Sequence, residues 1–170
     1  LPYLPYTNLD SYSVCGGEVG VQARWNNGFS ARFTYAYTKE QLAKDKDGNT
    51  INNQYIPARE HAFNARMDYD HQFTKNYGLN IGLSGRYLSG VENVEYKNYY
   101  NVSEGTLTVS YPAYTIWKLS LVQRIGKAVK VTAALDNLFG YKPKYYYLNS
   151  PITDGVNLQV GLSVDIDKLF

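Results

Sequence analysis

The residues best suited to bind a ligand in this 170-residue sequence are tyrosines and asparagines that gather in one long polar stretch. Between Val94 and Tyr111 the candidates are Tyr96, Asn98, Tyr99, Tyr100 and Asn101. A tyrosine presents a rigid amphipathic ring, and an asparagine presents both hydrogen-bond donors and acceptors. This mixture suits sugars, metal chelates or the edge of a haem. A loop whose aromatic rings pack on their neighbours has the same composition, so binding and packing are both open interpretations.

A second group of candidates consists of charged residues in rows of alternating polarity, where Arg66, Asp68, Arg86 and Lys118 stand out. Every second residue of a strand points to the same face of a sheet, so each strand presents its charges on one side. We expect these four side chains to face the interior of a barrel. They could contact another part of the protein or a polar solute, or they could pair with one another in a solvated wall.

Motifs for catalysis and for metal binding do not occur. There is no Gly-x-Ser-x-Gly turn, phosphate-binding loop or His-Glu-x-x-His pair in the sequence. His61 and His71 would lie roughly 33 Å apart on one strand, so they cannot share a metal ion. The segment 45–49 has the composition of a calcium loop, but Ala43 and Gln54 occupy the positions where acidic ligands belong. The sequence therefore predicts no enzyme, no metal site and no cofactor.

The elements that carry these residues show a period of two along almost the whole chain, which is typical of strands with two different faces. In the segment 61–73, for example, apolar and aromatic residues such as Phe63, Met67 and Phe73 alternate with polar ones such as Asn64 and Arg66. The segments with this pattern are 13–25, 29–38, 61–73, 79–88, 113–125, 129–136 and 156–166. We therefore expect about seven strands.

The connections between these strands alternate in length. The short ones contain Asn26-Asn27-Gly28, residues 74–78 and Gly126-Lys127-Ala128, and the long ones cover residues 41–57, 90–112 and 140–155. In an antiparallel up-and-down meander this order places all short turns at one end, as in outer-membrane β-barrels. Aromatic residues also gather towards strand ends, where membrane headgroups would meet them. The expected fold class is therefore all-β, an antiparallel meander that forms part of a transmembrane β-barrel.

The balance of charged residues limits the classes of partner that the chain is expected to bind. The 17 basic residues nearly balance the 15 acidic ones, so nucleic acid is not an expected partner.

Two alternatives to a piece of a larger barrel stay open. One is a complete eight-stranded barrel with a structural or adhesive role, which needs an eighth strand in 1–13. The other is a soluble β-sandwich or lipocalin-like binding module. Seven is an odd number, whereas single-chain bacterial barrels have an even number of strands. A sheet with unpaired edges also cannot lie in lipid. Both points favour a segment of a larger barrel.

Several motifs resemble elements of one family. Leu135-Asp136-Asn137-Leu138-Phe139, followed by Tyr141, resembles the "NLF" element near the end of TonB-dependent outer-membrane receptors, and 155–170 resembles their last strand. Asn8 with Gly17-Glu18, and Pro57 before the strand at 61, resemble two earlier elements in the family's order. Asp154-Gly155-Val156 departs from the Pro-Gly-Arg that often precedes the last strand.

The resemblance implies that residues 1–170 are the C-terminal segment of a barrel of about 22 strands, whose plug domain and earlier strands lie outside this sequence. Such receptors take up iron chelates, haem, cobalamin or glycans across the outer membrane of Gram-negative bacteria. The expected partners are outer-membrane lipid, the remainder of the receptor and, through the plug, TonB. Phe170 resembles the C-terminal aromatic signal that the barrel-assembly machinery reads.

Overall fold

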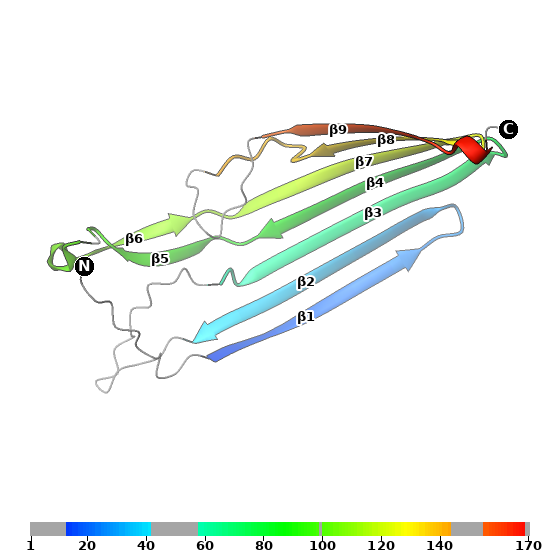
Figure 1. Ribbon diagram of the computed structural model, residues 1–170. Coiled ribbons are helices and arrows are strands. Elements are labelled where there is room, and N and C mark those ends of the chain that lie inside the picture. Colours follow the sequence, from blue (N-terminus) through cyan, green and yellow to red (C-terminus); the bar gives the residue numbers. More distant parts are fainter. Residues whose placement is uncertain (1–12, 42–57, 99, 144–154, 169–170) are drawn as a thin grey trace.

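A computed structural model describes residues 13–41, 58–98, 100–143 and 155–168 (Figure 1). Its largest element is one antiparallel sheet of seven strands in the order β1-β2-β3-β4-β7-β8-β9. These strands are β1 (Ser13–Arg24), β2 (Phe29–Gln41), β3 (His61–Thr74), β4 (Tyr77–Leu88), β7 (Tyr114–Ile125), β8 (Val129–Asp136) and β9 (Asn157–Val164). The predicted fold class and number of sheet strands are confirmed, because each strand pairs with the next one in the meander.

The strand register joins the apolar rows of all seven strands into one continuous apolar face. Val19 of β1 lies opposite Tyr35 of β2, which lies opposite Phe63 of β3. At the other side of the sheet, Leu119 of β7 lies opposite Leu135 of β8, which lies opposite Leu158 of β9. The alternate rows, with the charged side chains, therefore share the opposite, polar face.

The two ends of the sheet differ, as the loop lengths predict (Figure 1). The short turns after β1, β3 and β7 lie together at the end where β9 also finishes, which we call the short-turn end. The connections after β2, β4 and β8 leave the sheet at the opposite, long-connection end. Gly28 and Gly126 have positive φ angles of 90° and 63° in two of the short turns, a conformation that favours glycine.

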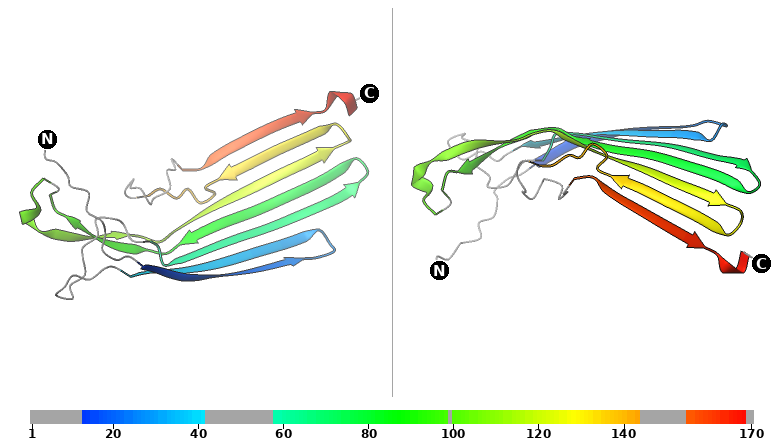
Figure 2. Two further views of the ribbon diagram at one scale, coloured as in Figure 1. Left: turned by 60° about the horizontal axis from the view of Figure 1, so that its bottom comes forward. Right: turned by 90° about the horizontal axis from the view of Figure 1, so that it is seen from above.

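The stretch between β4 and β7 contains structure that the sequence pattern did not predict. β5 (Val91–Tyr96) and β6 (Thr106–Tyr111) form a separate two-stranded antiparallel hairpin, with a short 3-10 helix, η1 (Val102–Glu104), at its tip. The hairpin projects beyond the long-connection end of the sheet (Figure 2). Its alternation is mixed, since Val91 pairs with Tyr111 but Asn93 pairs with Val109. β6 has an apolar row of Leu107, Val109 and Tyr111, but it is only six residues long and its partner β5 mixes apolar and polar residues in both rows.

The described residues enclose almost no apolar core. Only two hydrophobic side chains in this part of the chain are buried, those of Ala31 and Tyr111. Large apolar side chains are exposed instead, including Val160 at 71% and Leu162 at 70%. A β-sandwich would bury these rows against a second sheet, whereas the seven strands here lie in a single curved layer (Figure 2). The chain leaves the sheet through a second 3-10 helix, η2 (Ile166–Lys168).

No helix in the described ranges is both long enough and apolar enough to span a membrane.

Candidate functional site

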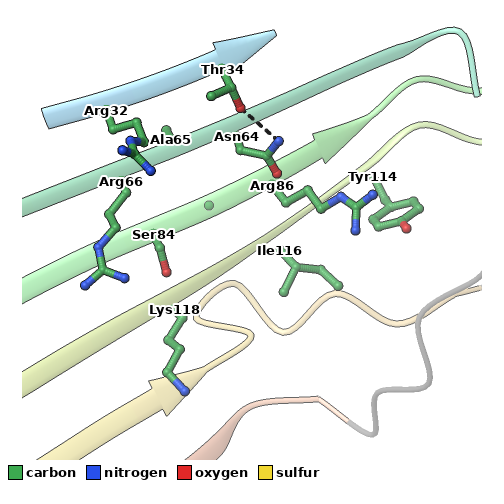
Figure 3. A pocket seen from close by; sticks show the side chains of 11 residues that line it. Arg32, Thr34, Asn64, Ala65, Arg66, Ser84, Arg86, Tyr114, Ile116 and Lys118 are labelled. Carbon is green, nitrogen blue, oxygen red and sulfur yellow. Dashed lines mark hydrogen bonds between the residues drawn. The ribbon is translucent and has the colours of Figure 1, made fainter. Parts of the chain in front are cut away.

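The polar face has a hollow of about 440 Å³ over strands β2, β3, β4 and β7 (Figure 3). We call it the basic hollow, because four cationic side chains line it. These are Arg32, Arg66, Arg86 and Lys118. The structure therefore brings together three of the four charged residues predicted to share one face. The fourth, Asp68, does not line the hollow but forms an ion pair with Arg66.

Strand register explains why the cations meet. Arg32 lies directly opposite Arg66, Arg66 lies opposite Ser84, and Ser84 lies opposite Lys118. Arg86 stands two residues further along β4, opposite Asn64. The sequence predicts the face of each residue, but only strand pairing fixes its level along the sheet. The alternation of the sequence also assigns Arg32 to the polar row, but it does not show that Arg32 lies beside Arg66.

Two of the four cations have a carboxylate partner. Arg66 donates two hydrogen bonds to Asp68 on its own strand, at 2.8 and 3.0 Å. Lys118 forms an ion pair with Asp136 of β8, with a distance of 2.9 Å between Nζ and Oδ1. Arg32 donates instead to the neutral amide of Gln22, at 2.7 Å. These contacts turn the side chains of the two opposed arginines in different directions, which relieves the repulsion expected for like charges in register.

Arg86 differs from the other three. Within the described ranges, no hydrogen bond or ion pair joins its guanidinium to another group. Figure 3 shows it extending along the sheet towards Tyr114, beside Ile116. Ile116 interrupts the polar row of β7, and it supplies an apolar wall to the hollow. The site thus offers two guanidinium groups without a carboxylate, those of Arg32 and Arg86.

The tyrosine- and asparagine-rich candidates lie in a different place, at the tip of the β5–β6 hairpin. Asn98 and Asn101 both donate from their amide nitrogens to the same carboxylate oxygen of Glu104, at 3.0 Å each. Asn98 also accepts a hydrogen bond from the backbone of Tyr100, whose side chain is 96% exposed. The two amides therefore order the tip, and Tyr100 projects from it. Tyr96 ends β5, and its ring and Tyr99 lie outside the described part of the chain.

The base of the hairpin is held by Arg59, which sequence reasoning missed. Its Nη1 donates to the carbonyl oxygens of Ser89 and Pro112, the latter at 2.9 Å. These carbonyls mark the points where the chain leaves β4 and enters β7. The guanidinium carbon also lies 4.9 Å from the centre of the Tyr114 ring, a cation–π contact. Arg59 thus fixes the hairpin to the rim of the sheet.

The predicted "NLF" element has a clear structural role. Asn137, just after β8, has a φ of 52° and is only 4% exposed. Its amide donates to the carbonyls of Tyr141 and Gly155 at 2.8 and 3.1 Å, and its oxygen accepts from the backbone of Tyr141 at 2.9 Å. Asparagine tolerates this left-handed conformation better than most residues. Burial raises the pKa of the Tyr141 phenol, which stacks on Tyr114.

The two histidines lie in aromatic clusters at opposite ends of β3. His61 shares a hydrogen bond of 2.8 Å with the hydroxyl of Tyr35 at the long-connection end. His71 stacks on Tyr69 and meets the edge of Phe73 at the short-turn end. Among the described residues, no group of three or more histidine, cysteine or acidic side chains could hold a metal ion. Phe170, the predicted assembly signal, lies outside the described residues.

Comparisons with known proteins agree with this geometry. A family model described as "TonB dependent receptor-like, beta-barrel" matches residues 2–138. Among solved structures, the FrpB iron transporter from Neisseria meningitidis (F3-3 variant) is similar, with a TM-score of 0.61 and 18% sequence identity over 90% of this chain. This chain covers 23% of that structure, so it spans about a quarter of the transporter's length. The search among curated proteins gave no match.

Proposed function

The chain belongs to the family of TonB-dependent receptor-like β-barrels, and we propose that it is the C-terminal barrel segment of an outer-membrane receptor. The receptor takes up a scarce ligand across the outer membrane of a Gram-negative bacterium, with energy relayed by TonB. This family comprises receptors and transporters rather than enzymes. The chain then contributes one part of the wall, and the plug domain and earlier strands come from elsewhere in the protein.

The continuous apolar face of the sheet is the observation that carries this proposal. Exposed valine, leucine, isoleucine and phenylalanine side chains cover one side of the strands, and charged side chains cover the other. In water, so large an apolar surface would be costly. In a membrane barrel it faces lipid, and the polar rows face the interior. Aromatic clusters such as that of Tyr35 and Phe63 then lie near the headgroups.

The edges of the sheet support a larger barrel. In the described ranges β1 pairs with β2 alone and β9 with β8 alone, so each has one unpaired edge. Unpaired backbone groups cannot remain in the hydrocarbon region of a membrane. We infer that strands outside this sequence pair with both edges and close the barrel. Closure by further strands distinguishes this proposal from a complete eight-stranded barrel.

The ligand belongs to the classes that such receptors carry, namely iron chelates, haem, cobalamin or glycans. An iron-containing ligand is the first to test, because the similar solved structure is that of an iron transporter. We place the ligand-binding loop at the hairpin tip, where Tyr100 projects, together with Tyr96, Asn98, Tyr99 and Asn101. Phe170 is proposed as the signal for the barrel-assembly machinery, and lipid surrounds the apolar face.

Two neighbouring residues of β9 test the membrane arrangement in the full-length receptor. Val160 belongs to the apolar face and Gln159 to the polar face. In lipid bilayers we expect Val160→Lys to lower the free energy of unfolding by about 2–4 kcal/mol, and Gln159→Lys to change it by less than about 1 kcal/mol. Equal effects of the two substitutions would contradict the proposed orientation.

Transport needs its own test. Deleting the gene should abolish growth on an iron chelate or haem as the sole iron source, and the intact gene should restore it. Growth at the wild-type rate on every ligand class, with the gene deleted, would contradict an uptake role.

A further inference from the structure

We propose that the basic hollow binds an oxyanion, a carboxylate or phosphate group whose oxygens accept hydrogen bonds from Arg32 and Arg86. This inference deepens the proposed function and rests on it in one respect, because it takes the polar face to line the interior of a closed barrel. The site lies on the wall of the sheet, away from the hairpin tip proposed to meet the ligand first.

The basic hollow carries an excess of positive charge. Four cations line the hollow, and of these four only Arg66 and Lys118 have a carboxylate partner in the described part of the chain. The guanidinium groups of Arg32 and Arg86 therefore give this part of the wall an uncompensated positive charge. Their surroundings are not fully apolar, since Asn64 and Ser84 also line the hollow. An anion that enters meets two charges and several neutral polar groups.

Closure of the barrel would reduce the access of water to these arginines. On an open sheet, water solvates an arginine that has no carboxylate partner, so its charge costs little free energy. Inside a barrel that further strands close, water is limited and charge interactions are screened less than in bulk. Two guanidinium groups without a carboxylate partner in such a place are then much more favourable when an anion neutralises their charge. An arginine also presents several N–H donors in a planar fork that matches carboxylate and phosphate oxygens.

The positions of Arg32 and Arg86 on the sheet decide whether one group can reach both. Arg32 is on β2 and Arg86 on β4, with β3 between them and an offset of two residues along the strands, so their backbones are roughly 12 Å apart. To meet on one group above β3, the guanidinium of Arg32 has to leave Gln22 of β1 and that of Arg86 has to turn from Tyr114, and the length of an arginine side chain allows both movements. Asn64 lies on β3 opposite Arg86, and one N–H of its amide bonds Thr34 at 3.1 Å. Its second N–H is available as a further donor to the same anion.

The oxyanion could come from two sources. It is either a soluble ligand that passes through the receptor or a carboxylate side chain from a part of the receptor outside this sequence. Both place the same chemical group at the same arginines. The experiment below separates them, because only a soluble anion can be added to the purified protein.

The test uses the full-length receptor in detergent, with citrate and inorganic phosphate as probes and sodium chloride at equal ionic strength as the reference. Binding is measured by calorimetry, and the melting temperature by tyrosine and tryptophan fluorescence. The variants are Arg86→Gln, Arg32→Gln and Arg86→Lys. Lys130→Gln is the matched control, because Lys130 is a cation of the polar face of β8 that does not line the hollow.

If the oxyanion is a soluble ligand, citrate or phosphate binds the wild type and raises its melting temperature beyond the effect of chloride. Arg86→Gln and Arg32→Gln then weaken binding by about tenfold or more, since each removes a charge-assisted hydrogen bond. Arg86→Lys keeps the charge but loses the fork, so it restores binding only in part. Lys130→Gln binds as the wild type does.

If the oxyanion is a carboxylate of the receptor itself, added anions change nothing in the wild type. Arg86→Gln and Arg32→Gln then lower the melting temperature, and Lys130→Gln does not. The inference is overturned if the probes have no effect and the two arginine variants melt with the control. Heat-modifiable migration of the same samples shows whether the barrel forms, so failure of the oxyanion site is distinguishable from failure of the proposed function.

Discussion

Arg124 of β7 reaches across β4 and forms an ion pair with Asp70 of β3, with 2.6 Å between Nη2 and Oδ1. The two residues are not on adjacent strands, because β4 lies between them. Arg124 is in register with Gly78 of β4, and a Cβ atom at Gly78 would come within 2.9 Å of its guanidinium. The missing side chain at Gly78 therefore lets the arginine cross the strand.

This pair should show measurable coupling. In a double-mutant cycle with Asp70→Asn and Arg124→Gln, we expect a coupling energy of about 0.2–1 kcal/mol in urea unfolding, because both side chains are partly exposed. The coupling should fall at about 1 M salt, where charges are strongly screened. When the cycle is repeated in the Gly78→Val background, the coupling energy between Asp70 and Arg124 should also fall. A coupling that is zero in low salt would contradict the ion pair in solution.

A second glycine of β4 supports an aromatic ring on the apolar face. Gly85 lies opposite Trp117, and the indole ring covers the glycine so closely that a Cβ atom there would clash with it. We expect Gly85→Val to displace the ring and to lower the free energy of unfolding by about 1–3 kcal/mol. Gly17→Val is the control, because open space surrounds that position. Equal melting of both variants would show that the ring is not held there.

Asn137 contributes to stability through its side-chain hydrogen bonds and through its tolerance of a positive φ, and two substitutions can separate these contributions. Asn137→Ala removes the side-chain hydrogen bonds to Tyr141 and Gly155 and places alanine at a φ of 52°. Asn137→Gly loses the same bonds but accepts that φ without strain. We expect the alanine variant to be destabilised by about 2–4 kcal/mol and the glycine variant by about 1 kcal/mol less, in denaturant titrations. The reverse order would refute the backbone contribution.

Removing the Arg59 contacts should loosen the hairpin and leave the barrel intact. In Arg59→Gln the carbonyls of Ser89 and Pro112 lose their donor, so we expect faster hydrogen exchange in β5 and β6 with little change in the melting temperature. Arg59→Lys keeps one donor and should give an intermediate rate. Unchanged exchange in Arg59→Gln would mean that β4 and β7 alone hold the hairpin.

The sequence predicts the sheet well because each sheet strand has one apolar row, and a period of two identifies such rows directly. It does not predict β5 and β6, because both strands are only six residues long and β5 mixes apolar and polar residues in each row. It assigns Arg66 and Arg86 to the polar face but cannot bring Arg32 beside Arg66, because that proximity depends on the register between β2 and β3. Arg59 precedes β3 in a segment without periodicity, so no pattern marks it.

The order of the meander also affects how the protein folds. Every sheet pairing in the described ranges joins strands that follow one another in the meander, so hairpins can form locally and add in sequence with a small loss of chain entropy. The free edges of β1 and β9 have no such local partner among the described strands. If β9 closes the barrel against its first strand, that pairing joins segments very far apart in the chain. We therefore expect closure at β9 to be among the slowest steps of assembly.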